Sequence, residues 1–266
     1  MTHTVKVALS GSGFRLPAHV GAITALIDHG YRITEIAGTS GGAIVAALYA
    51  SGMPIYEMRN LALTYDWRKL LSLDLISGVR HGAYCSGNAL LEFLKQKTGY
   101  QRFGDLKIPL KIIASDLKTG AEVCLNVRNH SLMSIALAAR ASASIPLVYA
   151  PIHYMNYCLV DGGCCNNIPV DHLSQGGLRV GICLTSGEKM FNNSMSTFDV
   201  IERSLEMMLN SNESIHEKLD KTLGATIINI PTGYAGSLDR NMSISIRRTL
   251  FTDAYLAVAK RIARGA

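Results

Sequence analysis

The sequence predicts an α/β fold: a three-layer α/β/α domain around a central, mostly parallel sheet. Strand-type apolar segments alternate with helix-type segments through most of the chain, which is the pattern of a layered α/β domain. The chain has 266 residues, 48% of them hydrophobic, which is enough to bury one large core. We therefore expect a single domain over residues 4–262, with its motifs in residues 4–185 and a less clearly patterned part in residues 186–266.

The first strand-to-helix unit lies at the N-terminal end. Residues 4–9 have the composition of a strand, Pro17 suits the start of a helix, and Gly30 suits its end. The loop between strand and helix is Gly11-Ser12-Gly13-Phe14-Arg15-Leu16. Such a glycine-rich loop presents backbone N–H groups to an anion. Arg15 is a candidate phosphate contact because a guanidinium matches phosphate geometry; a structural ion pair or a plain surface position is the alternative.

The second unit contains the pattern Gly-x-Ser-x-Gly. Residues 32–37 alternate like a strand and residues 43–50 are Ala-rich like a helix, so the segment Gly38-Thr39-Ser40-Gly41-Gly42 is a strand-to-helix turn. That context is typical of a nucleophile elbow. The glycines permit a tight turn, and the helix N-terminus offers N–H groups to developing negative charge. We interpret Ser40 as a nucleophile; a chance serine in a glycine-rich turn is the alternative.

The first loop has three interpretations. One is a dinucleotide-binding fingerprint, but Leu16 replaces its third glycine and Glu35 lies inside a strand rather than at its end. Another is an ordinary strand-to-helix connection. The third is an oxyanion hole for Ser40, since acyl transfer needs N–H donors beside the nucleophile. We favour the oxyanion hole and expect no cofactor.

The remaining elements continue the alternation. We expect a turn at residues 116–120. Asp116 is a candidate catalytic carboxylate there, but we favour its interpretation as a turn residue. Further strands are expected at residues 110–116, 121–127, 159–160, 180–184 and 225–230, and helices at residues 131–141, 198–209 and 250–262.

Composition excludes several classes of function. The net charge is +6, but the basic residues are scattered without interleaved aromatics, so we expect no nucleic acid partner and leave peripheral contact with a membrane surface open. The six cysteines include no C-x-x-C pair, which disfavours a metal site and favours reduced thiols in a cytoplasmic protein. No signal peptide and no run of membrane-spanning length is expected.

Three motifs occur in order: Gly11-Ser12-Gly13-Phe14-Arg15, Gly38-Thr39-Ser40-Gly41-Gly42 and Asp161-Gly162-Gly163. Together they resemble the patatin-like phospholipase family, which has a glycine-rich oxyanion loop, a Gly-x-Ser-x-Gly elbow and an Asp-Gly-Gly or Asp-Gly-Ala triplet. The family usually has glycine where Leu16 and Ser12 stand. Further segments resemble family features in the same order: Gly82-x-Tyr84, Asp116-Leu117-x-Thr119-Gly120, Ala141-Ser142-Ala143-x-x-Pro146 and Asn167-x-Pro169-Val170.

The resemblance implies a lipid acyl hydrolase acting on phospholipid or lysophospholipid through a Ser40–Asp161 dyad. Ser40 would be the nucleophile and Asp161, held by the turn Gly162-Gly163, its base. The oxyanion hole would comprise Gly11, Ser12, Gly13 and Gly41. Three alternatives remain: an acyltransferase with the same intermediate, a regulatory lipid-binding protein, and a Ser–His–acid esterase in which Asp116 or Asp161 precedes His172 or His216.

Overall fold

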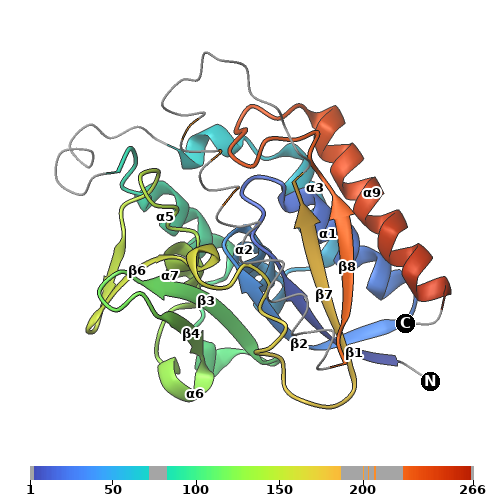
Figure 1. Cartoon of the computed structure of the whole chain (residues 1–266), viewed down its shortest axis with the longest axis horizontal. Coiled ribbons are helices and arrows are strands. Elements are labelled where there is room, and N and C mark those ends of the chain that lie inside the picture. The colour runs from blue at the N-terminus through green and yellow to red at the C-terminus, as the bar shows by residue number, and fades with distance from the viewer. Residues whose placement is uncertain are drawn as a thin grey trace.

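A computed structural model of the chain describes residues 3–71, 83–186 and 224–264, and the isolated positions 200, 203 and 207. The described strands form one sheet in the order β5-β6-β3-β2-β1-β7-β8, with β4 paired to β3 (Figure 1). Their bounds are β1 His3–Leu9, β2 Tyr31–Thr39, β3 Leu110–Asp116, β4 Glu122–Asn126, β5 Ile152–Tyr154, β6 Tyr157–Asp161, β7 Leu178–Thr185 and β8 Thr226–Pro231.

The sheet is mixed, with a parallel centre. β3, β2, β1, β7 and β8 run parallel to one another. β4 and β6 pair antiparallel with β3, and β5 pairs antiparallel with β6. The predicted α/β class with a mostly parallel central sheet is therefore confirmed, and each predicted strand segment coincides with an observed strand.

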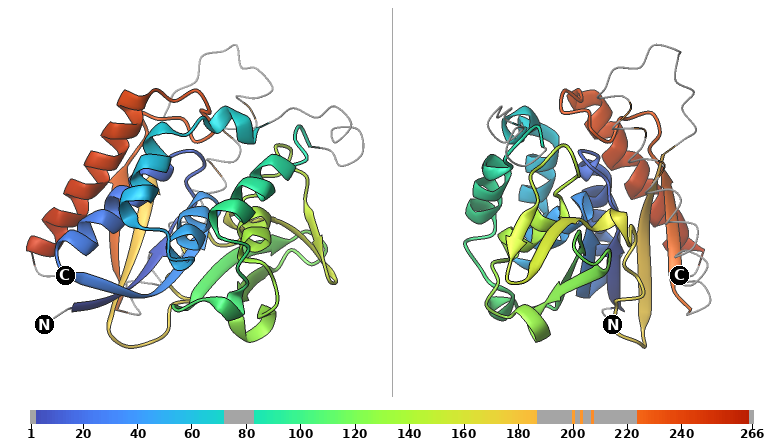
Figure 2. Two further views of the ribbon diagram at one scale, coloured as in Figure 1. Left: turned by 180° about the vertical axis from the view of Figure 1, so that it is seen from behind. Right: turned by 60° about the vertical axis from the view of Figure 1, so that its left-hand side comes forward.

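Helices cover one face of this sheet in the described part of the chain. Seen from behind, they lie in front of the strands (Figure 2). The helices are α1 Leu16–Asp28, α2 Gly41–Ala50, α3 Ile55–Thr64, α5 Asn88–Lys97, α6 Val127–His130, α7 Ile135–Ser142 and α9 Ile244–Ala263, and the short 3₁₀ turns are η1 Trp67–Leu70, η2 Phe103–Asp105 and η3 Gly162–Cys164. The predicted helix at residues 198–209 falls almost wholly outside the described residues.

Two apolar clusters occupy the two faces of the sheet. On β1, Val7 and Leu9 belong to the large cluster under the helices, whereas Ala8 belongs to a small one. Adjacent strand residues point to opposite faces, so the small cluster lies on the far face. There the segment that follows η3 contributes Ile168, Val170 and Leu173. This segment therefore covers the face of the sheet opposite the helices.

Candidate functional site

Strand β3 brings the two distant motifs together. β4 pairs with β3 along Lys111–Ser115, so β2 and β6 must share the other edge of β3. On that edge Thr39, the last residue of β2, pairs with Ile113, and Asp161, the last residue of β6, pairs with the next residue, Ala114. Because β2 and β6 run in opposite directions along this edge, their carboxyl ends meet head to head.

Ser40 and Asp161 consequently lie in hydrogen-bond contact. The Ser40 hydroxyl donates to Oδ2 of Asp161 at 2.6 Å. Ser40 has a φ of 51°, an unfavourable conformation for a residue with a side chain, and its N–H donates to the hydroxyl of Ser142 at 2.8 Å. A strained serine between β2 and α2 matches the geometry of a nucleophile elbow.

The elbow depends on glycine for close approach. A Cβ atom on Gly38 would lie 2.6 Å from the carbonyl oxygen of Gly42, closer than such atoms can pack. The first turn of α2 thus packs directly on the end of β2. These close approaches agree with the sequence-based explanation for this pair of glycines, a turn with no room for side chains.

The carboxylate of Asp161 is buried but held by hydrogen bonds. Its Oδ1 accepts the N–H of Gly163 at 2.8 Å, and a Cβ atom on the intervening Gly162 would collide with the carbonyl of Ile113. Burial raises the pKa of Asp161 to about 6, although the hydrogen bonds from Ser40 and Gly163 act in the opposite direction. This carboxylate is therefore a stronger base than an exposed aspartate and is still ionised at neutral pH.

The predicted oxyanion loop lies beside Ser40, but one of its amides is already used. The N–H of Gly11 donates to the carbonyl and the side-chain oxygen of Asn167 at 3.0 and 3.1 Å, which removes it as a donor to substrate. In the described residues no protein acceptor is bonded to the N–H of Ser12 or Gly13. Gly41 is the first residue of α2, so its N–H has no acceptor within the helix.

Arg15 does not occupy the predicted anion-contact position. Its side chain is buried, 1% exposed, and its Nε donates to the carbonyl of Ser12 at 3.1 Å. Its Nη1 donates to the hydroxyls of Ser186 and Thr232, both at 2.9 Å. These residues directly follow β7 and β8. Arg15 therefore fixes the loop to the ends of two strands, which is a structural role like the alternative to a phosphate contact given above, here made through hydrogen bonds to Ser12, Ser186 and Thr232.

No histidine completes a triad within the described residues. Asp116 binds its own turn, accepting from Lys118 N–H and the Thr119 hydroxyl, which confirms it as a turn residue. His172 contacts Glu122 on β4, and the hydrogen-bond partners recorded for Ser40 and Asp161 include no imidazole. His216 lies outside the described residues.

One group of described residues has donors of metal-ligand type. The side-chain donor atoms of Glu122, Asp171 and His172 lie within 4.8 Å of one another. Burial lowers the pKa of His172, but Cys124 and Glu122 outweigh this effect and raise that pKa to about 10. The imidazolium thus forms an ion pair with Glu122 and supplies the positive charge that a metal ion would bring.

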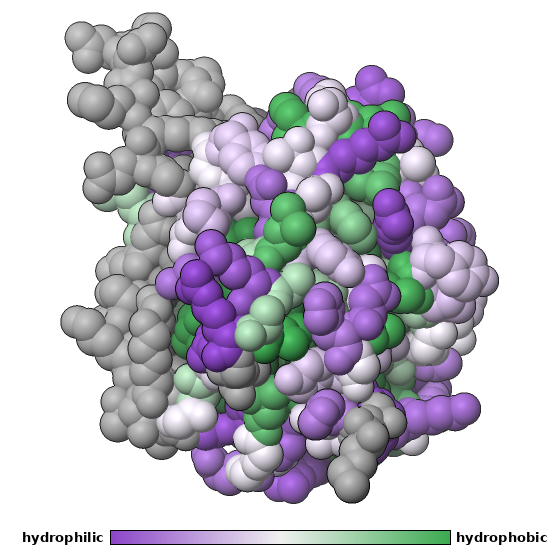
Figure 3. All heavy atoms as spheres, turned by 90° about the vertical axis from the view of Figure 1, so that its right-hand side faces the viewer, coloured by the Kyte–Doolittle hydropathy of each residue, from purple (hydrophilic) through white to green (hydrophobic). Residues whose placement is uncertain are grey.

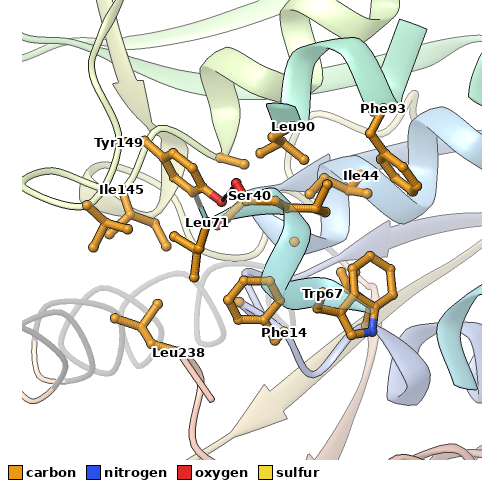
Figure 4. Close-up of a pocket in the computed structure, with 16 residues that line it drawn as sticks. Phe14, Ser40, Ile44, Trp67, Leu71, Leu90, Phe93, Ile145, Tyr149 and Leu238 are labelled. Carbon is orange, nitrogen blue, oxygen red and sulfur yellow. Dashed lines mark hydrogen bonds between the residues drawn. The ribbon is translucent and has the colours of Figure 1, made fainter. Parts of the chain in front are cut away.

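An apolar pocket lies at Ser40 (Figure 4), with a cavity volume of about 40 Å³, or about 500 Å³ when all the space at its open mouth is counted. Leu90 and Phe93 of α5, Ile44 of α2 and Tyr149 contribute side chains to it. Gly13 and Gly41 also line the pocket, so two of the predicted oxyanion residues face the same space as the Ser40 hydroxyl. A largely apolar pocket with few polar groups is typical of a small-molecule site.

Sequence reasoning missed the side chains that support this site. Ser142 holds the Ser40 amide and Asn167 holds the Gly11 amide. Both residues lie in segments that resemble family features. The sequence therefore pointed to these segments, but it did not predict the contacts that the two side chains make. A third support is the Thr39 hydroxyl, which donates to the Asn166 carbonyl at 2.9 Å.

Comparison with known proteins gives consistent matches. The sequence model of the patatin-like phospholipase family matches residues 7–174. The uncharacterized protein YqhO of Bacillus subtilis is 31% identical in an alignment 236 residues long that covers 78% of this chain and 81% of that protein. An uncharacterized NTE family protein of Mycobacterium bovis is 30% identical over 69% of this chain and 50% of its own length. The lysophospholipase NTE1 of Candida albicans is 28% identical over 69% of this chain but only 13% of its own length.

Solved structures share the fold at low sequence identity. VipD from Legionella pneumophila aligns with a TM-score of 0.69 and 16% identity, covering 99% of this chain and 67% of VipD. The type III effector ExoU aligns with a TM-score of 0.58 and 15% identity, covering 99% of this chain and 53% of ExoU. Among the described helices, none combines the length and the apolar character needed to cross a bilayer.

Proposed function

The chain belongs to the patatin-like phospholipase family, and from that premise we propose that it is a lipid acyl hydrolase acting through Ser40 and Asp161. The observation that carries the proposal is the 2.6 Å hydrogen bond between these side chains at an apolar pocket. The chain spans only a small part of the lysophospholipase relative, so the substrate class is part of the proposal.

The dyad would perform two acyl transfers. Asp161 accepts the Ser40 proton as Oγ attacks the ester carbonyl carbon, and the tetrahedral intermediate then expels the alcohol, which takes that proton. Water next attacks the acyl-serine with Asp161 again as the base, and a fatty acid leaves as Ser40 is regenerated. A carboxylate with a pKa of about 6 is ionised at neutral pH and still basic enough to assist both steps.

The oxyanion would be stabilised by backbone amides. Gly13 and Gly41 line the pocket beside Ser40, and the Gly41 amide lies at the N-terminus of α2. We assign the donor role to these two, with Ser12 as a further candidate, and leave Gly11 out because Asn167 holds its amide. Loss of one such donor typically costs about 100- to 1,000-fold in rate.

The pocket favours an acyl chain over a polar substrate. Apart from Ser40 its lining side chains are almost all apolar, and the hydroxyl of Tyr149 is bonded to the Leu70 carbonyl. Burial of methylene groups gives about 0.8 kcal/mol each, so fatty esters should bind better as the chain fills the pocket. Phospholipid and lysophospholipid are the substrates that we propose.

Mass spectrometry of lipid extracts incubated with wild type and with Ser40→Ala tests this function. Wild type should release fatty acids and Ser40→Ala should not, and a fluorophosphonate probe should label only wild type. Ser51→Ala is the matched control, because Ser51 lies at the other end of α2 with its hydroxyl on the Leu48 carbonyl. Equal fatty acid release by wild type and Ser40→Ala would refute the assignment.

A further inference from the structure

A second cavity, with a volume of about 310 Å³, lies at the N-terminus of α9. It shares no lining residue with the pocket at Ser40, which we call the serine pocket. Three arginines line the second cavity, Arg68, Arg240 and Arg247, but only one carboxylate does, that of Asp66. Arg68 already forms a 2.7 Å ion pair with Asp66. We call this space the arginine cavity, and its surplus of positive charge favours an anionic occupant.

Arg240 and Arg247 have no acidic partner in the described part of the chain, where no carboxylate lies within 4 Å of either guanidinium. Arg240 donates Nη1 to the Leu71 carbonyl at 3.2 Å, and Arg247 donates Nη1 to the Tyr65 carbonyl at 2.6 Å. Among the described residues no acceptor is bonded to either Nη2 atom. Both cations therefore keep donors for a ligand.

Arg247 is a buried cation, only 7% exposed. Burial lowers the pKa of Arg247, and the charges of Asp66 and Asp239 act in the opposite direction. Asp239 does not line the cavity, and its Oδ1 accepts the Asn241 amide at 2.9 Å. A desolvated guanidinium without a carboxylate at hydrogen-bond distance is stabilised by an anion that enters the cavity.

The N-terminus of α9 adds further donors. Ser243 caps the helix by accepting the Ile246 amide at 3.2 Å. The N–H groups of Ile244 and Ser245 have no protein acceptor in the described residues, and Ser243 and Ile244 line the cavity. A helix of 20 residues also carries partial positive charge at this end. Guanidinium groups and helix N-termini both bind phosphate, so the two kinds of donor fit one ligand.

The same two arginines hold one wall of the serine pocket. This wall segment, residues 63–71, includes η1, and its carbonyl groups accept Nη1 of Arg240 at Leu71 and Nη1 of Arg247 at Leu63 and Tyr65. Three of its side chains line the serine pocket: Trp67, Leu70 and Leu71. A ligand that fixes the two guanidinium groups therefore also acts on the wall of the serine pocket.

We propose that the arginine cavity binds a phosphate monoester group that is not part of the lipid substrate, and that the bound group orders the wall segment of the serine pocket. The Nη2 atoms and the first amides of α9 bind the phosphate oxygens, while the Nη1 atoms keep their bonds to the wall segment. The cavity thus serves as an effector site. The binding of phosphate is independent of the proposed function, and only its effect on turnover rests on that function.

Trp67 makes the binding measurable because the chain contains one tryptophan. This side chain lies next to Arg68 in η1 and is 2% exposed. Titration of Ser40→Ala with inorganic phosphate, at an ionic strength held constant with chloride, should change the Trp67 emission and give a Kd. Arg240→Gln in the same background should raise this Kd about tenfold, the typical effect of one charge-assisted hydrogen bond. Arg128→Gln, on α6, controls for net charge and should leave the Kd unchanged.

Asp66→Asn provides a gain of affinity, which a damaged fold would not produce. Asparagine keeps a side-chain oxygen for the Arg68 amide, which Asp66 accepts at 3.3 Å, but removes the one carboxylate that lines the cavity in the described residues. Phosphate affinity should therefore rise about threefold. Weaker binding by Asp66→Asn, or an equal Kd with and without Arg240, would overturn the site.

Two further ligands identify the molecule that carries the phosphate. Glycerol 3-phosphate presents a phosphate monoester in solution, and vesicles of phosphatidic acid present the same group on a membrane. Binding of glycerol 3-phosphate that depends on Arg240 would identify a soluble ligand. Binding that requires phosphatidic acid vesicles, with none to phosphatidylcholine vesicles, would identify a membrane lipid. Binding of inorganic phosphate but of neither ester would overturn the assignment to a phosphate monoester.

Turnover tests the link to the serine pocket. With wild type, saturating phosphate should lower the KM for p-nitrophenyl laurate about fivefold, because an ordered wall costs the acyl chain less entropy on binding. The KM for p-nitrophenyl butyrate, whose short chain needs little of the wall, should change less. Phosphate binding with an unchanged laurate KM would overturn the effector role. If wild type hydrolyses no ester, the Trp67 titration still decides the site, so failure of the site and failure of the hydrolase are distinguishable.

Discussion

The hydroxyl of Ser40 and the carboxylate of Asp161 lie 2.6 Å apart although 121 residues separate them in the chain. The contact follows from sheet register, because Thr39 and Asp161 pair with consecutive residues of β3, Ile113 and Ala114. Relative movement of β2 and β6 along β3 would break it. The dyad geometry is therefore a property of the sheet rather than of a loop.

The first prediction concerns the pH dependence of activity. Because only the ionised carboxylate accepts a proton, kcat/KM should fall as pH decreases through about 6, the pKa of Asp161. The measurement is kcat/KM on a soluble ester between pH 4 and 9, with circular dichroism at each pH to exclude unfolding. A profile that stays flat down to pH 4.5 would contradict Asp161 as the base.

Asp161→Asn should abolish activity while stabilising the fold at high pH. Burial raises the pKa of Asp161 from 3.8 to about 6, so the folded state binds the proton more tightly than the unfolded chain does. The contribution of Asp161 to the free energy of unfolding is therefore fully present below pH 4 and is lost as the pH rises through 6. For a pKa shift of this size the loss is about 3 kcal/mol. Removing the charge should recover part of this loss.

Thermal unfolding at pH 8 and pH 4 measures that effect. At pH 8 the Asn variant should unfold at a higher temperature than wild type, by about 2–4 °C for each kcal/mol recovered. At pH 4 the difference should vanish, since wild-type Asp161 is then protonated. A lower unfolding temperature for the variant at pH 8 would mean that the Gly163 and Ser40 hydrogen bonds outweigh the burial cost.

Ser142→Ala should impair both stability and rate. The Ser142 hydroxyl accepts the buried amide of Ser40, and an unsatisfied buried donor costs about 1–3 kcal/mol. Because the lost bond also fixes the strained backbone of Ser40, kcat should fall more than KM changes. Urea unfolding and steady-state kinetics measure the two effects. A variant with wild-type kcat and reduced stability would show that Ser142 serves the fold alone.

Arg15→Met should destabilise the protein and should leave its affinity for phosphate unchanged. The variant loses hydrogen bonds to Ser12, Ser186 and Thr232, so we expect a loss of about 2–4 kcal/mol in the free energy of unfolding. Arg32→Met, on an exposed residue of β2, is the matched control. Loss of phosphate affinity with unchanged stability would restore the sequence-based interpretation of Arg15 as an anion contact.

The fold class could be predicted because it depends on local patterns. Apolar alternation marks the strands, and glycine positions mark the two strand-to-helix turns. The burial of Arg15 could not be predicted, because Ser186 and Thr232, which accept from it, are 171 and 217 residues away in the chain. Nor did the sequence indicate that Asn167 would occupy the Gly11 amide, since no local pattern encodes which loop closes over another.

The surface around α9 could not be predicted from the sequence either. Seen from that side, polar and apolar side chains are mixed and form no single continuous apolar patch in the described part of the surface (Figure 3). The net charge of +6 left peripheral membrane contact open, because a charge count does not show where on the surface the charges lie. The grouping of Arg68, Arg240 and Arg247 beside the start of α9 became visible only when the fold brought residues near 68 and 240 together.

The last prediction concerns acyl chain length. Ile44 on α2 lines the serine pocket and is 8% exposed, so a larger side chain there should take up space that an acyl chain would fill. Ile44→Phe should leave butyrate esters nearly as good substrates as before, because a short chain needs little of the pocket. For laurate esters kcat/KM should fall at least tenfold, equivalent to burying about two fewer methylene groups. Val45→Phe, a buried neighbour that does not line the pocket in the described residues, controls for overpacking. Equal losses on butyrate and laurate for Ile44→Phe would place the acyl chain outside this pocket.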